Sequence, residues 1–240
     1  MRNLNITEFL ANNPVLTLAL IAHVLADFHW QSQDLADRKV ISQKALWEHL
    51  GIVAIPLVIS SILSPSSYLV MGLVWLSHVL IDYAKFFLAP KFTNGRWPAY
   101  LFTVDQFCHY LAIIGIYLAI SPQQTQLILN PNWLTLALFF LIITKPINII
   151  FKLYFERYQV ELEDTSSISG AGAMVGNLER LIIGIFLILG QYAAIALVFT
   201  AKSIARYDMI SKNQGFAEYY LIGSLFSMIS VLVTYALLIF

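Results

Sequence analysis

The chain has 240 residues, of which 59% are hydrophobic and only 12% are charged. Soluble globular proteins carry about 25% charged and about 45–50% apolar residues, so this composition excludes a water-soluble enzyme and a disordered chain. The formal net charge of +0 gives no bulk electrostatic attraction to DNA or RNA, so we expect no nucleic-acid partner. The single cysteine, Cys108, cannot form an intrachain disulfide. The sequence therefore predicts an integral membrane protein.

Seven segments are long and apolar enough to cross a bilayer as helices of roughly 20 residues. In chain order they cover residues 14–30, 45–63, 66–88, 99–120, 131–155, 174–200 and 216–240. We expect an all-α, polytopic membrane helical bundle with six or seven spans. Residues 1–122 are predicted to form a four-helix membrane domain, and residues 123–240 a C-terminal domain of two or three spans with a possible re-entrant segment near 190.

Lysine and arginine residues set the expected orientation, because they accumulate in cytoplasmic loops. The loops after the first and third segments carry six of them, whereas those after the second and fourth carry none. The six are Arg38, Lys39, Lys44, Lys85, Lys91 and Arg96. This alternation predicts that the N-terminus lies outside the cell. Lys202, Arg206 and Lys212 break the rule, so either the segment around Gly190 is re-entrant or these cations are paired inside the protein.

A short sequence recurs in the first and third segments. Residues 23–28, HVLADF, return as HVLIDY at residues 78–83, with four of six positions identical. Each following segment carries a histidine near the same end, His49 and His109. The first four helices are therefore predicted to be two parallel copies of one helical hairpin, an arrangement that places binding sites at the interface of the copies.

The repeated residues predict a polar layer inside the membrane. A histidine and an aspartate four residues apart share one helix face, and the pair at 105 and 109 has the reverse order on a segment of opposite direction. In all three pairs the histidine therefore lies deeper in the membrane and the aspartate nearer the cytoplasm, and His49 falls at a similar depth. The candidate metal ligands are His23, Asp27, His49, His78, Asp82, Asp105 and His109.

Charge explains why this layer suggests a metal. Three aspartates in a low-dielectric bundle are costly unless they are neutralised, and one or two divalent cations would do so. Imidazole and carboxylate ligands suit zinc, which we expect first, with manganese or iron as alternatives. Seven donors exceed the four of a structural zinc site, so a dinuclear or open catalytic site is feasible. Two other interpretations stay open: hydrogen bonds that fix helix packing, and a proton relay in a transporter.

Two further residues are candidates for catalysis. Lys145, midway along the fifth segment, could clamp a substrate oxyanion or phosphate, or serve as a counter-charge beside a helix kink at Pro146. Glu48, next to His49, could act as a general base. A third group flanks the last two segments and is interpreted as an ion-pair network that fixes packing, or as a site for an anionic head group. Its members are Glu179, Arg180, Lys202, Arg206 and Glu218.

The polar residues also resemble a known family. The pattern His23-x3-Asp27-Phe28-x2-Gln31, His49, His78-x3-Asp82-x2-Lys85 and Asp105-Gln106-x2-His109 is similar to that of the bacterial membrane family called domain of unknown function 3307. The resemblance covers about residues 15–120 and implies a multi-pass protein of the bacterial inner membrane. A looser similarity links its HxxxD helices to membrane proteins classed as metal-dependent hydrolases, which is an analogy of fold only.

These observations favour a membrane-embedded, metal-dependent hydrolase of a lipid or phosphoester that enters from the inner leaflet or the cytoplasm. The alternatives are a proton- or cation-coupled transporter and a non-catalytic membrane partner subunit. The expected partners are the lipid bilayer and a small-molecule or lipid substrate, and the chain could also form oligomers.

Overall fold

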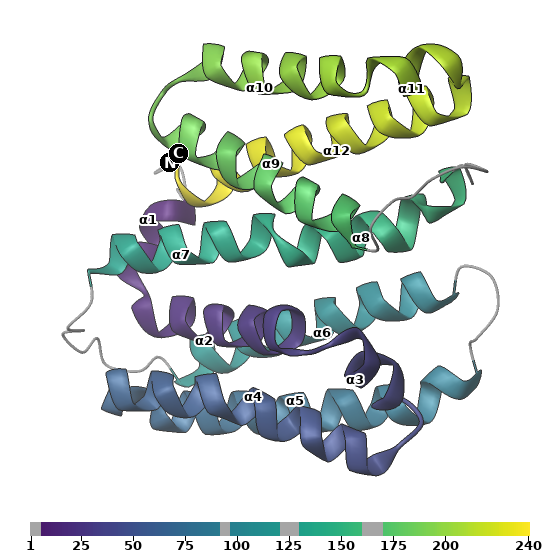
Figure 1. Cartoon of the computed structure of the whole chain (residues 1–240). Helices are drawn as coiled ribbons and strands as arrows, with labels where there is room; N and C mark the ends of the chain where they lie inside the picture. The colour runs from purple at the N-terminus through teal and green to yellow at the C-terminus, as the bar shows by residue number, and fades with distance from the viewer. Residues whose placement is uncertain (1–5, 92–96, 121–129, 160–169) are drawn as a thin grey trace. The chain divides into compact units, whose positions relative to one another are not determined.

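The computed structural model describes residues 6–91, 97–120, 130–159 and 170–240, and regular structure within these ranges is entirely helical (Figure 1). Six helical stretches are long and apolar enough to span a membrane, and a seventh is added if a bent pair near the N-terminus counts as one. The prediction of an all-α polytopic bundle with six or seven candidate spans is confirmed.

Contacts divide the chain into two compact units, Met1–Leu138 and Phe139–Phe240. The division falls inside α7 (Pro131–Ile143). The boundary expected between residues 122 and 123 lies outside the described residues. Each unit has its own buried polar residues.

The first unit contains a four-helix bundle of α2 (Pro14–Val24), α4 (Gln43–Leu63), α5 (Tyr68–Leu88) and α6 (Trp97–Ile120), together with the short helices α1 (Ile6–Asn12) and α3 (Gln33–Arg38). Helices α2 and α5 each pack against both α4 and α6, which closes the ring. Leu16, Leu46 and Met71 are almost completely buried between them. An apolar core therefore surrounds the inward-facing polar residues.

The first span changes its helical geometry before it ends. After Val24 the chain continues as a π-helical turn, η1 (Leu25–Trp30), which stops where Gln31 adopts an extended conformation. Turns of this kind are rare and occur often at functional sites. Asp27 lies within the turn and is buried, so the HxxxD pair of the first span is not held by a regular α-helix throughout.

In the second unit, the fifth segment is broken between α7 and α8 (Lys145–Phe155). The break is at Thr144, whose φ and ψ of −94° and −107° are not helical. Pro146 was expected to kink the helix. The break lies two residues before Pro146, in agreement with that expectation, and Pro146 occupies the first turn of α8, where its missing N–H has no helical partner to lose.

The sixth segment is not one span, which corrects the expectation for residues 174–200. It forms α9 (Ala171–Ile188) and α10 (Tyr192–Ala205), which pack against each other. The turn between them contains Gly190 at φ 68°, a left-handed conformation that favours glycine. Figure 1 shows that α10 runs back along α9 before α11 (Tyr207–Lys212) and α12 (Gln214–Leu238) follow.

A single buried guanidinium donates hydrogen bonds to the polar groups around the break between α7 and α8. Arg180 of α9 is only 2% exposed, and all three of its side-chain nitrogens donate hydrogen bonds to neutral oxygens. The acceptors are the carbonyls of Ile143 and Thr144, Asn148 Oδ1, Asn177 Oδ1 and Ser227 Oγ. Carbonyls at a helix end have no partner within the helix, so Arg180 stabilises the break. We call Arg180 and these acceptors the Arg180 centre.

The expected ion-pair network is present in part. Lys202 Nζ lies 2.6 Å from Glu179 Oε2 and donates a second hydrogen bond to Ser224. Arg206, in contrast, is exposed and contacts the sulfur of Met209. Lys202 is paired within the protein, and α10 runs back along α9. Internal pairing of the cations and a reversal of the chain near Gly190, the two explanations offered from the sequence, are therefore compatible.

Candidate metal centre

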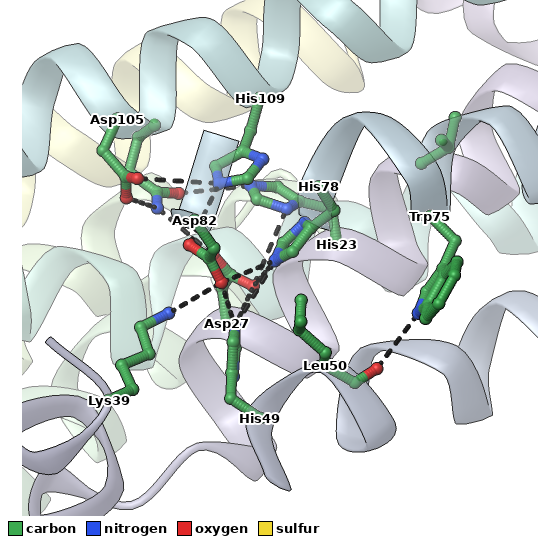
Figure 2. Close-up of polar contacts among 12 residues, drawn as sticks. His23, Asp27, Lys39, His49, Leu50, Trp75, His78, Asp82, Asp105 and His109 are labelled. Atoms are coloured by element: carbon green, nitrogen blue, oxygen red, sulfur yellow. Dashed lines mark hydrogen bonds and ion pairs between the residues drawn. The ribbon is translucent and has the colours of Figure 1, made fainter. Parts of the chain in front are cut away.

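All seven predicted ligands meet in the core of the first unit (Figure 2). They come from four helices and the π-helical turn, and each is at most 8% exposed. Their donor atoms form three overlapping groups in which the atoms lie within 4.8 Å of one another. The groups are His23, His78 and His109; Asp27, His49 and His78; and Asp82, Asp105 and His109. We call the seven residues the His/Asp cluster.

Four donor atoms of the cluster lie close together, and five of the six distances between them fall between 3.1 and 3.6 Å. The Nε2 atoms of His49 and His78 are 3.3 Å apart. Asp27 Oδ1 lies 3.6 and 3.3 Å from these two nitrogens, and Asp82 Oδ2 lies 3.1 and 3.5 Å from them. Ligands at about 2.0–2.1 Å from a tetrahedral zinc are about 3.3–3.4 Å from one another. The measured separations therefore suit a zinc ion of that coordination.

Several polar atoms in the cluster are buried without a hydrogen-bond partner. They are His23 Nδ1, Asp27 Oδ1, His49 Nδ1, Asp82 Oδ1, Asp105 Oδ1 and His109 Nε2. Buried polar atoms are nearly always paired, and each exception needs an explanation. Three of these atoms are carboxylate oxygens, which are acceptors only. A bound cation would satisfy them, so the donor set fits a divalent metal.

Two lysines that the sequence placed in loops reach the cluster. Lys39, which follows α3, lies with Nζ 3.4 Å from Asp82 Oδ2 and is 5% exposed. Lys85, near the end of α5, lies with Nζ 2.8 Å from Asp105 Oδ2. These two ammonium groups reduce the formal charge of the three aspartates from −3 to −1. Part of the neutralisation that the sequence assigned to divalent cations is therefore supplied by lysines.

Gln106 of α6 is a further polar member that the ligand prediction left out. Its Nε2 donates to Asp27 Oδ2 at 3.3 Å and to Asp105 Oδ2 at 3.1 Å, and its Oε1 lies 3.2 Å from His23 Nε2. The glutamine thus holds the outer oxygens of two aspartates and leaves their inner oxygens free. Its position next to Asp105 in the sequence was the available signal.

The two predicted catalytic residues do not join this cluster. The Glu48 side chain is 52% exposed and lies 3.8 Å from Arg38, because successive residues of a helix point to different faces and His49 takes the buried one. Lys145 begins α8 and is half-buried within the second unit.

Comparisons with known proteins agree with the motif resemblance. No curated protein and no solved structure matches the chain. A family model described as "Protein of unknown function (DUF3307)" matches residues 15–136, a stretch that contains the whole His/Asp cluster. The chain therefore belongs to this family.

Proposed function

We propose that this chain is a membrane protein that binds a divalent metal, zinc first, and uses it to hydrolyse a lipid or phosphoester. The observation that carries the proposal is the placement of His49 Nε2 and His78 Nε2 3.3 Å apart, each within 3.1–3.6 Å of both Asp27 Oδ1 and Asp82 Oδ2. Manganese and iron accept the same ligand types. A metal here would lower the pKa of a bound water and supply a nucleophile.

The two lysines that contact the cluster favour an enzyme with an anionic substrate. An ammonium group beside a ligand carboxylate opposes cation binding, so it is a poor feature for a protein that only captures cations. The same charge attracts a phosphoester and stabilises negative charge that develops during hydrolysis. Lys39 and Lys85 are thus assigned the electrostatic role predicted for Lys145, and Glu48 is assigned no part in the chemistry.

Cation-coupled transport would use the same residues but requires that the ion leave them in each cycle. Three carboxylates and four imidazoles within one cluster favour retention instead. We therefore prefer hydrolysis to transport.

The first test is metal content. Wild type and His78→Ala are purified in detergent, and zinc, manganese and iron are measured by mass spectrometry. His29→Ala is the matched control, because His29 is the one histidine outside the cluster. We expect metal in wild type and in His29→Ala, and its loss from a monodisperse His78→Ala protein. Equal metal in all three proteins, or none in any after incubation with zinc, would refute the proposal.

The second test separates hydrolysis from transport. Metal-loaded protein is incubated with bis-p-nitrophenyl phosphate and with a fluorescent phosphatidylglycerol in mixed micelles. We expect cleavage of a phosphoester that depends on His78. Zinc uptake into proteoliposomes with no cleavage would support the transporter, and a folded protein with neither activity would support a packing role.

We further propose that the protein lies in the bacterial inner membrane with both termini outside. Arg38 and Lys44 remain exposed or half-buried in the loop after the first span, and the α9–α10 hairpin returns Lys202 toward the end where α9 begins. Single cysteines, placed at Arg38 and at Gln191 in a Cys108→Ser background, test this. A membrane-impermeant maleimide should label position 191 in intact spheroplasts and position 38 only after lysis.

A further inference from the structure

The two oxygens of Asp82 face different sets of donors. Asp82 Oδ2 lies 3.1 and 3.5 Å from the Nε2 atoms of His49 and His78, the first metal position, and is also the oxygen that Lys39 approaches. Asp82 Oδ1 has no hydrogen-bond partner and lies 3.7 Å from His109 Nε2. One carboxylate therefore borders two separate positions.

The residues at the second position, Asp82, Asp105 and His109, each offer one donor atom within 4.8 Å of the other two. Asp82 Oδ1, Asp105 Oδ1 and His109 Nε2 are all buried, and none has a hydrogen-bond partner. His109 Nε2 is 3.7 Å from each of the two oxygens. These separations exceed hydrogen-bond length, so the three donors surround a point rather than bonding to each other.

Neighbouring contacts hold the three donors in this orientation. Lys85 Nζ and Gln106 Nε2 both donate to Asp105 Oδ2, at 2.8 and 3.1 Å, which turns Oδ1 inward. The rings of His78 and His109 stack with their centroids 4.0 Å apart, so the second position lies directly beside the first. Such support from outer residues is typical of ligands that bind metals.

We propose that the cluster binds a second divalent cation at Asp82 Oδ1, Asp105 Oδ1 and His109 Nε2, with Asp82 as the bridge between two ions. This inference rests on the proposed function, since it requires the first ion. Enzymes with two ions about 3.5–4 Å apart clamp both the attacking and the leaving oxygen of a phosphoester. Three protein donors leave coordination positions open, as in catalytic rather than structural sites.

Charge identifies the class of ligand that completes the second position. Three aspartates and two lysines sum to −1, so one dication gives +1 and a second gives +3. Such an excess of positive charge in a low-dielectric core requires an anion. We therefore expect the second ion to bind weakly alone and at least tenfold more tightly with inorganic phosphate, which stands in for the phosphoester substrate.

The experiment is a manganese titration followed by electron paramagnetic resonance and metal analysis, with and without inorganic phosphate. Wild type should bind two equivalents with phosphate present and show a spin-coupled spectrum. Asp105→Asn and His109→Ala should each bind one equivalent, uncoupled, whereas the control His29→Ala should behave as wild type.

The outcomes distinguish the two proposals. One uncoupled equivalent in wild type, unchanged by Asp105→Asn and His109→Ala, would overturn the second ion and leave the first intact. No bound metal in wild type would overturn the proposed function itself. The wild-type spectrum decides the matter even if a variant fails to fold.

Discussion

The two units bury ionisable side chains in opposite ways. In the Arg180 centre one cation donates from all of its nitrogens to neutral oxygens of its own unit. In the His/Asp cluster, carboxylate oxygens of Asp27, Asp82 and Asp105 are buried and unpaired. A satisfied polar group stabilises a fold, whereas an unsatisfied one costs free energy that a ligand can recover. The difference indicates a structural role for the Arg180 centre and supports the metal site proposed for the His/Asp cluster.

The largest effect on stability should follow from removal of the Arg180 guanidinium. Arg180→Met keeps much of the volume but removes the donors to the carbonyl of Ile143 and to Asn148 Oδ1. We expect the free energy of unfolding in mixed micelles to fall by about 3 kcal/mol, because each buried, unpaired acceptor costs about 1–3 kcal/mol. The loss should be the same with zinc and with a chelator. A loss seen only with zinc present would contradict the structural role.

In the His/Asp cluster, by contrast, the effect of a substitution on stability should depend on zinc. Zinc at a hundredfold excess over its dissociation constant should stabilise wild type by about 2.7 kcal/mol, because the ion binds the folded state. His49→Ala should abolish this gain while it leaves the stability of the chelated protein changed far less. Thermal unfolding with and without zinc measures both. A zinc effect that persists in His49→Ala would remove His49 from the ligand set.

Packing around glycine offers a smaller contrast between the units. A Cβ on Gly184 would lie 3.0 Å from Phe139 and 3.1 Å from Ile143, whereas one on Gly51 would meet nothing within 4 Å. Gly184→Ala should therefore cost about 1–3 kcal/mol through overpacking. Gly51→Ala should stabilise α4 by about 0.5–1 kcal/mol, because alanine favours helices. Equal effects on unfolding would show that α9 is not closely packed.

The smallest effect should come from Glu48→Gln. Glu48 forms only an exposed contact with Arg38, and such pairs contribute about 0.2–1 kcal/mol at most. Metal content, hydrolysis and stability should stay close to wild type. A tenfold or larger loss of hydrolysis at unchanged metal content would restore Glu48 as the general base.

The sequence predicted the spans and the seven cluster residues because both follow from local rules. Apolar length defines a span, and a spacing of four places His78 and Asp82 on one helix face. Lys39 and Lys85 were assigned to loops from their sequence positions. A long side chain can reach several ångströms from its backbone, so sequence position does not show where its ammonium group lies. The break near Gly190 was indicated by the lysine and arginine pattern, whereas the saturation of Arg180 depends on contacts between distant segments, which no local pattern encodes.

The π-helical turn at Leu25–Trp30 has a consequence for how the first span tolerates insertions and deletions. It accommodates an extra residue between the apolar face of α2 and Asp27. Removal of one residue, such as Ala26, would restore regular α-helix and rotate everything before it by about 100° with a shift of about 1.5 Å. His23 and Leu16 would then turn away from the bundle together, although the sequence would still contain all seven residues of the cluster. The alignment of the first span with its three neighbours thus depends on a single residue of backbone length.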